Sequence, residues 1–151
     1  MSAEDPHIPG NHRNGASATI RQGTRIETIM ANGHKVVADQ PVYQGGTDEG
    51  PAPVDMMLAS LCACKVSVMG KFAARKGYAM ESATVFARWV KSGLPNVPDT
   101  IQCEINIVGD LSEDERKRVY AASGVCAVQK IFATETKIES ITTDTPAEPF
   151  V

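Results

Sequence analysis

The chain has 151 residues, a net charge of -3 and 42% hydrophobic residues, enough material for one domain with its own core. Acidic and basic residues are interspersed, so the basic stripe of a nucleic-acid surface is missing and no nucleic-acid partner is expected. No uninterrupted apolar run approaches the roughly 20 residues that span a bilayer, and no apolar signal segment opens the chain. We therefore expect a cytoplasmic protein without a membrane partner.

Residues 1–15 are polar, with two histidines among prolines, and predict a flexible arm before a single domain over residues 16–151. The chain also has an even number of cysteines. These are Cys62, Cys64, Cys103 and Cys126. Because the chain is not small and shows no export signal, they are expected to be buried, catalytic or metal-binding cysteines and not structural disulfides.

Residues 16–39 predict a β-hairpin. Strand-like composition at residues 19–20, 25–29 and 35–37 is interrupted by Asn32-Gly33, a strong signal for a tight turn between antiparallel strands. The following residues 44–53 are rich in glycine and proline and predict a loop.

A long helix is predicted from Val54 to Lys76, followed by Gly77 as its stop. Its apolar positions step by three or four residues and so share one helical face. They are Met57, Leu61, Cys64, Val68 and Phe72. Other faces are apolar as well, so this helix is expected to be central and mostly buried.

The rest of the chain alternates between strands and helices. Ser112 and Glu115 form the pattern of a capping box and predict a helix that runs to about Ser123 and is broken by Gly124. The other predicted elements are strands at 80–91 and 100–108, a short helix at 125–132 and a strand at 136–142. This order predicts an α+β fold with an antiparallel sheet.

Three of the cysteines differ in what their positions indicate. Cys62 and Cys64 are two residues apart, about 200° around a helix, so a shared metal ion or a disulfide between them is disfavoured and no metal is expected. Cys103 alternates with isoleucines on one strand face and is expected in the core. The positions of the histidines relative to the cysteines do not match zinc-ligand spacing either.

Two roles remain open for Cys64 and for Cys126. Cys64 lies on the apolar helical face, where it could be a small buried hydrophobic residue or a redox residue. Cys126 stands where a new helix begins, and the positive end of the helix dipole favours thiolate over thiol. A buried structural cysteine at a helix junction is the alternative for Cys126.

The motifs around both cysteines resemble the OsmC/Ohr family (osmotically inducible protein C-like). The first motif runs from Ala38-Asp39-Gln40-Pro41 through Gly45-Gly46 and Asp48 to Gly50-Pro51-Ala52-Pro53 and on to Cys64. The second is Gly109-Asp110-Leu111-Ser112 followed by Cys126-Ala127-Val128-Gln129-Lys130. The resemblance covers residues 16–142 and identifies the chain as a general OsmC-like member.

The resemblance implies a fold and a reaction. The fold is an intertwined homodimer with antiparallel sheets wrapped around long central helices. The reaction is that of a thiol-dependent peroxidase in which Cys64 attacks an organic hydroperoxide and becomes a sulfenic acid, and Cys126 then forms a disulfide with it. An external thiol or dithiol restores both, so no cofactor is needed.

Some residues depart from the family pattern. The Ohr branch uses an arginine from the N-terminal strands and a glutamate near the start of the long helix. The strict glutamate position is Val54 here, so its role passes to the neighbour Asp55, and the arginine is Arg25 or Arg21. On residue grounds alone, Asp55 is a helix N-terminal charge and Arg25 a solvated strand charge. The histidine common after the second cysteine is Gln129.

These departures keep a second function open. A non-catalytic OsmC-like dimer that binds a small ligand or senses redox state would not need the arginine and the glutamate. Steady-state kinetics with a bulky hydroperoxide and a dithiol distinguishes that protein from a peroxidase.

Overall fold

The computed structural model describes residues 15–97, 99–140 and 142. The expected flexible arm, except Gly15, lies outside these residues. The chain divides into two compact units, one of residues up to Asp55 together with those from Glu139 onwards, the other Met56–Ile138. The expectation of a single domain over residues 16–151 stays a prediction, and each unit is described by itself.

The first unit is built on a three-stranded antiparallel sheet. Its strands are β1 (Ala16–Ile20), β2 (Ile26–Met30) and β3 (Lys35–Ala38), in the order β1-β2-β3. The predicted turn joins β2 to β3, where the N–H of Gly33, at a φ of 86°, donates to the carbonyl of Met30. The hairpin expectation is therefore confirmed, and β1 extends it to three strands.

A loop held by one buried carboxylate leads out of β3. Asp39 is 0% exposed and accepts hydrogen bonds from the backbone N–H groups of Gln40, Thr47 and Glu49 at 2.8, 3.0 and 3.2 Å. The hydroxyl of Thr47 donates to it as well, at 2.5 Å. These bonds stabilise the charged form and lower the pKa of Asp39 far below its usual value. Asp39 therefore fixes the path of residues 40–49 toward the long helix.

The long helix α1 spans Pro53–Lys76, close to the predicted bounds. Proline suits its first position because the N–H that proline lacks has no partner there in any helix. At its end the N–H of Gly77 donates to Ala74 O and the N–H of Tyr78 to Ala73 O, a Schellman motif. Gly77 has a φ of 68°, which a glycine adopts without strain.

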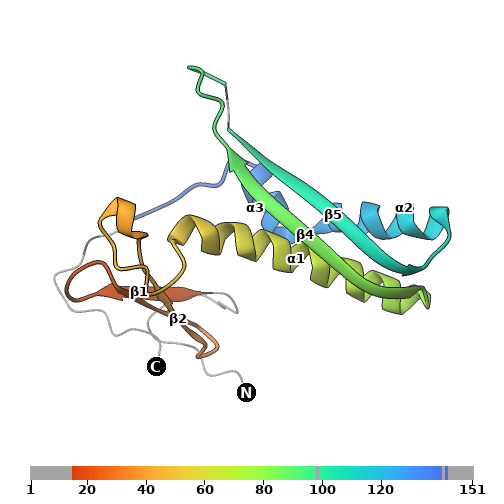
Figure 1. Ribbon diagram of the computed structural model, residues 1–151, viewed down its shortest axis with the longest axis horizontal. Coiled ribbons are helices and arrows are strands. Elements are labelled where there is room, and N and C mark those ends of the chain that lie inside the picture. Colours follow the sequence, from red (N-terminus) through yellow and green to blue (C-terminus); the bar gives the residue numbers. More distant parts are fainter. Residues whose placement is uncertain (1–14, 98, 141, 143–151) are drawn as a thin grey trace. The chain divides into compact units, whose positions relative to one another are not determined.

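The second unit packs α1 against a long β-hairpin (Figure 1). The hairpin consists of β4 (Ala79–Val90) and β5 (Thr100–Asp110), which pair antiparallel in a two-stranded sheet. Three helical segments follow in the chain. These are α2 (Glu113–Ala122), a 3-10 turn at Ser123–Val125 and α3 (Ala127–Ala133). Met69 and Ala73 of α1, Val85 of β4 and Val119 of α2 form the buried cluster at the centre.

The start of α2 follows its sequence signal. Ser112 is the N-cap, its hydroxyl accepts from the N–H of Glu115, and the Glu115 carboxylate accepts from the N–H of Ser112. Two donors at the helix start are thus satisfied.

Three expectations are wrong. Of the strand expected at 136–142, residues 136–140 and 142 are not in a strand, and residue 141 lies outside the described residues. Cys103 is exposed, because it lines an open cavity and not the packed cluster. The helix α1 buries one face, not most of its surface. The buried residues of that face are Leu61, Lys65, Met69 and Ala73.

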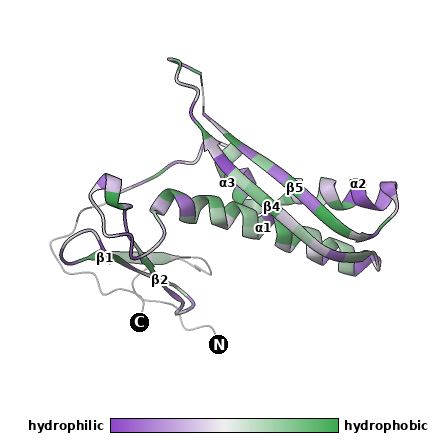
Figure 2. Cartoon of the chain, in the orientation of Figure 1, coloured by the Kyte–Doolittle hydropathy of each residue, from purple (hydrophilic) through white to green (hydrophobic). Residues whose placement is uncertain are grey.

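The helix α1 is predominantly apolar along its length, whereas α2 is strongly polar in places (Figure 2). By length and composition alone α1 could cross a membrane, although it contains no uninterrupted apolar run of about 20 residues. A core helix of a folded domain meets the same criterion, and one face of α1 packs on the β4–β5 hairpin. Length and composition are therefore shared by membrane-spanning helices and by core helices.

Candidate functional site: the Cys64–Cys126 thiol pair

The second unit brings Cys64 and Cys126 into hydrogen-bonding contact although they are far apart in the sequence. Cys64 is half-buried on α1, and Cys126 is fully buried as the N-cap of α3. All four cysteines carry free thiols. The two side chains lie close enough that each affects the ionisation of the other. The sequence named both residues, and the fold supplies the contact between them.

The first turn of α3 surrounds the Cys64 sulfur with donors. Burial raises the pKa of the Cys64 thiol, but the S–H of Cys126 and the backbone N–H groups of Val128 and Ala127 stabilise its thiolate, and the net effect lowers the pKa. Hydrogen bonds to the charged form of a group favour that form, so Cys64 is the more acidic thiol of the pair.

Cys126 has the opposite electrostatics. Burial raises its pKa, and donation of its proton to Cys64 raises it further. The N–H of Gln129 donates to the Cys126 sulfur at 3.4 Å, as expected of an N-cap acceptor. The expectation that the helix start favours the Cys126 thiolate is therefore wrong, because burial and the neighbouring Cys64 outweigh the N–H groups of α3 that lower its pKa.

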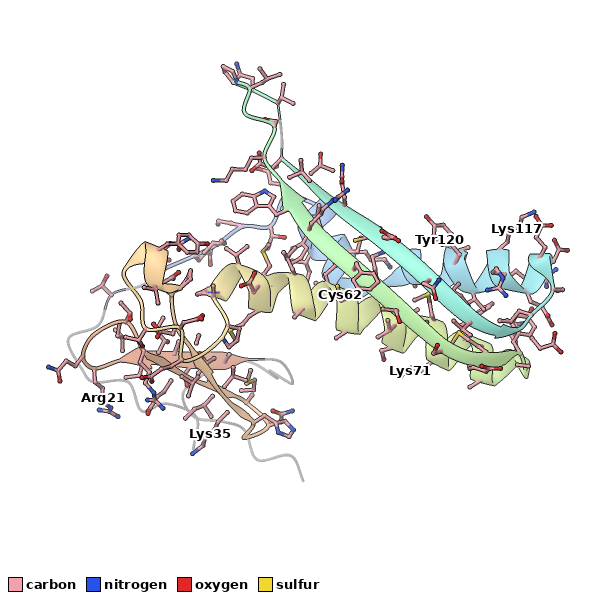
Figure 3. All side chains as sticks on the ribbon, viewed as in Figure 1. Arg21, Lys35, Cys62, Lys71, Lys117 and Tyr120 are labelled. Carbon is pink, nitrogen blue, oxygen red and sulfur yellow. The ribbon has the colours of Figure 1, made fainter. Side chains whose placement is uncertain are left out.

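Cys62 points to a different environment from that of Cys64. Figure 3 places Cys62 between α1 and the β4–β5 hairpin, where its thiol lies against the backbone of Ala87. Burial and the nearby Cys103 raise its pKa. Among the described residues no group of three or more potential metal ligands occurs. Cys62 and Cys64 thus lie in two separate surroundings, as their spacing on the helix indicated.

Comparison with known proteins places these residues in a family. The family model described as OsmC-like protein matches residues 46–141, which contain both Cys64 and Cys126. The chain belongs to the OsmC-like family. No curated protein matches the sequence significantly.

Solved structures agree with the OsmC-like fold. An OsmC-like protein from Mycoplasma pneumoniae has a TM-score of 0.68 and 17% identity, covering 82% of this chain and 89% of that one. An organic hydroperoxide resistance protein from Legionella pneumophila gives 0.58 and 19%, covering 80% and 89%. One from Elizabethkingia anophelis gives 0.59 and 22%, covering 82% and 89%. At these identities the likeness shows the α+β OsmC-like fold, which confirms the expected fold class.

The other two residues named from the family pattern lie in the first unit of this OsmC-like protein. Asp55 is exposed in the first turn of α1. Arg25 pairs with Glu27 at 3.0 Å and with Glu49 at 3.4 Å, all three side chains being about half exposed. Arg21 contributes to the electrostatic environment of Glu27. The catalytic roles of Asp55 and of either arginine stay predictions.

The sequence analysis missed a buried lysine next to the thiol pair. Lys65 is 5% exposed, and its ammonium donates to the Gln129 side-chain oxygen and, at 3.4 Å, to the carbonyl of Ser123. One signal was available. Lys65 stands four residues after Leu61 and four before Met69, so it interrupts an apolar face with a charge.

Proposed function

We propose that this OsmC-like protein is a thiol peroxidase that reduces organic hydroperoxides to alcohols. The observation that carries the proposal is the neighbouring pair of free thiols, with the pKa of Cys64 lowered and that of Cys126 raised. A thiolate is the nucleophile in peroxide reduction, and a second thiol within contact is what resolution requires. The hydroperoxide resistance proteins among the solved structures support the same substrate class.

The reaction follows from the two sulfurs. The Cys64 thiolate attacks the terminal peroxide oxygen, the O–O bond breaks, and the alkoxide takes a proton and leaves as alcohol. Cys64 is then a sulfenic acid. Cys126, as thiolate, attacks the Cys64 sulfur, an S–S bond forms, and the hydroxide leaves as water with the proton from Cys126. An external dithiol reduces this disulfide to two thiols and becomes the oxidised product.

The proposal includes a homodimer. Several large apolar side chains of the hairpin are exposed in the single chain, among them Phe86 at 63% and Trp89 at 42%. A second copy that covers these surfaces would remove apolar area from water. Sedimentation equilibrium at micromolar concentration tests this part, and a monomer would contradict it.

The test of the reaction uses the reduced full-length chain and cumene hydroperoxide. Peroxide consumption with a dithiol should be abolished in Cys64→Ser and retained in Cys103→Ser, the matched control. Mass-spectrometric mapping after one equivalent of peroxide should show a Cys64–Cys126 disulfide. If both thiols stay free under excess peroxide, the proposal is wrong.

A non-catalytic binding protein is the second candidate, and two observations favour it. Arg25 is already paired with Glu27 and Glu49 in its own unit. In addition, the second unit has a cavity of about 410 Å³ between α1, β5 and α3, of a size suited to a small ligand. Turnover no faster than that of free thiol would favour this candidate.

A further inference from the structure

Lys65 has a degree of burial that is unusual for its type. It follows Cys64 directly on α1 and is 5% exposed, and it is the one lysine or arginine buried among the described residues. Lysine is almost never fully buried without a partner, because removing an ammonium from water costs several kcal/mol, roughly, even after relaxation. A buried lysine at this position therefore calls for an explanation beyond packing.

The partners of Lys65 are neutral. Its Nζ donates to the Gln129 Oε1 atom and to the Ser123 carbonyl, and within the described part of the chain no carboxylate lies within ion-pair distance of it. Neutral oxygens satisfy the N–H groups but leave the charge uncancelled. The positive charge of Lys65 therefore remains available to act on neighbouring groups, and its low exposure makes that action stronger than in bulk water.

Gln129 connects this lysine to the thiol pair. Its side-chain oxygen accepts from Lys65, while its backbone N–H donates to the Cys126 sulfur at 3.4 Å. Ser123 lies just before Cys126 in the 3-10 turn that leads into α3. The ammonium of Lys65 thus binds α1 to the segments on both sides of Cys126, whose side chain lies beside that of Cys64.

The charge of Lys65 also acts on the sulfurs of α1. It favours the thiolate of Cys64, whose pKa is lowered, and partly opposes the rise in the pKa of Cys62 that burial and Cys103 cause. Arg25 is engaged by two carboxylates within the first unit. Lys65, in contrast, belongs to the same unit and the same helix as Cys64.

We propose that Lys65 is the positioning residue of the thiol pair, holding Cys126 against Cys64 through Gln129 and Ser123 and supplying the positive charge that favours the Cys64 thiolate. Its importance for turnover rests on the proposed peroxidase function. Its effect on the acidity of Cys64 does not, since the ionisation of a thiol is measurable without any substrate.

The test compares three variants at Lys65 with a control on the same helix. Lys65→Met and Lys65→Gln remove the charge, Lys65→Arg keeps it, and Lys71→Met removes an exposed lysine of α1 (Figure 3). The readout is the pH profile of Cys64 alkylation by iodoacetamide, resolved by mass spectrometry. Because a rise of one unit in pKa cuts the thiolate fraction about tenfold, both neutral variants should slow alkylation at pH 7 by about that factor. Lys65→Arg should restore most of the rate, and Lys71→Met should match the wild type.

Folding does not obscure this test. A neutral side chain costs less to bury than a charge, and glutamine still donates to Gln129, so Lys65→Gln decides the question if Lys65→Met fails to fold. If the neutral variants that fold titrate Cys64 as the wild type does, the proposal is overturned. Absence of peroxide turnover in the wild type would contradict the peroxidase function alone, and the alkylation profile would still test Lys65.

Discussion

The thiol of Cys126 lies beside that of Cys64 and lowers its pKa, while burial and Cys64 raise the pKa of Cys126, so Cys64 is the better thiolate of the pair. This division matches the two tasks of a peroxidatic and a resolving cysteine. The nucleophile should be ionised before peroxide arrives, whereas the resolving thiol should keep its proton until a sulfenic acid forms.

The two half-buried cysteines of α1 should differ in reactivity. Cys64 has a lowered pKa and Cys62 a raised one, although their exposure is similar. At pH values between about 6 and 8, below the pKa of a free thiol, iodoacetamide should therefore label Cys64 before Cys62. Peptide mass spectrometry at short reaction times measures both rates. Faster labelling of Cys62 would contradict the surroundings assigned to the two sulfurs.

The proton of Cys126 should support the acidity of Cys64. Cys126→Ala removes the donor, and the loss of a hydrogen bond to a charged group should raise the alkylation midpoint of Cys64 by about one pH unit. Cys126→Ser keeps an O–H donor at the same position and should raise the midpoint less, so it is the matched control. Equal midpoints in the wild type and Cys126→Ala would show that the contact does not stabilise the thiolate.

Local sequence signals predicted most elements of this fold. Asn32-Gly33 predicted the β2–β3 turn, Ser112 and Glu115 predicted the start of α2, and Gly77 predicted the end of α1. Each works through a hydrogen bond or a φ angle within a few residues. The strand expected at 136–142 had no such signal and rested on β-branched composition alone, and the described residues of that range are not in a strand.

The site was only partly predictable because its energetics depend on long-range contacts. Both cysteines were named, but which one is more acidic depends on the S–H···S contact and on where the α3 N–H groups point. A helix start was visible at Cys126, but the N–H groups of its first turn act on Cys64 of α1 as well as on Cys126. The burial of Lys65 likewise depends on Ser123 and Gln129, which lie far along the chain.

The buried carboxylate of Asp39 should make stability depend on pH in the acid range. Its folded pKa is lowered, so its contribution is fully present above the unfolded value of about 4 and is lost as pH falls toward the folded value. Asp39→Asn should therefore lower the thermal midpoint at pH 7, and the gap to the wild type should narrow below pH 4. The exposed Asp48 gives the control Asp48→Asn. A gap that is constant with pH would contradict this role of Asp39.

Substitution by alanine should lower the unfolding free energy at Gly50 and raise it at Gly70. A Cβ on Gly50 would meet the carbonyl oxygen and carbon of Val37, which are backbone atoms that cannot move independently. Gly50→Ala should therefore cost more than about 2 kcal/mol of unfolding free energy. Gly70 in α1 has open space at this position, and Gly70→Ala should add about 0.5–1 kcal/mol. Urea unfolding measures both, and a tolerated Gly50→Ala would contradict the close approach to β3.

Substitution of Arg25 tests whether its charge acts in catalysis or only in the ion pairs with Glu27 and Glu49. Its pairs with Glu27 and Glu49 are about half exposed, so Arg25→Gln should change the unfolding free energy by less than about 1 kcal/mol. If Arg25 has the role expected from the family pattern, the same variant should lower kcat/KM for cumene hydroperoxide by at least about tenfold, or roughly 1.4 kcal/mol of transition-state stabilisation. Lys35→Gln, which removes an exposed charge of β3, is the control. Unchanged kinetics in Arg25→Gln, together with a loss of activity in Lys65→Gln, would assign the supporting charge to Lys65 and remove Arg25 from the site.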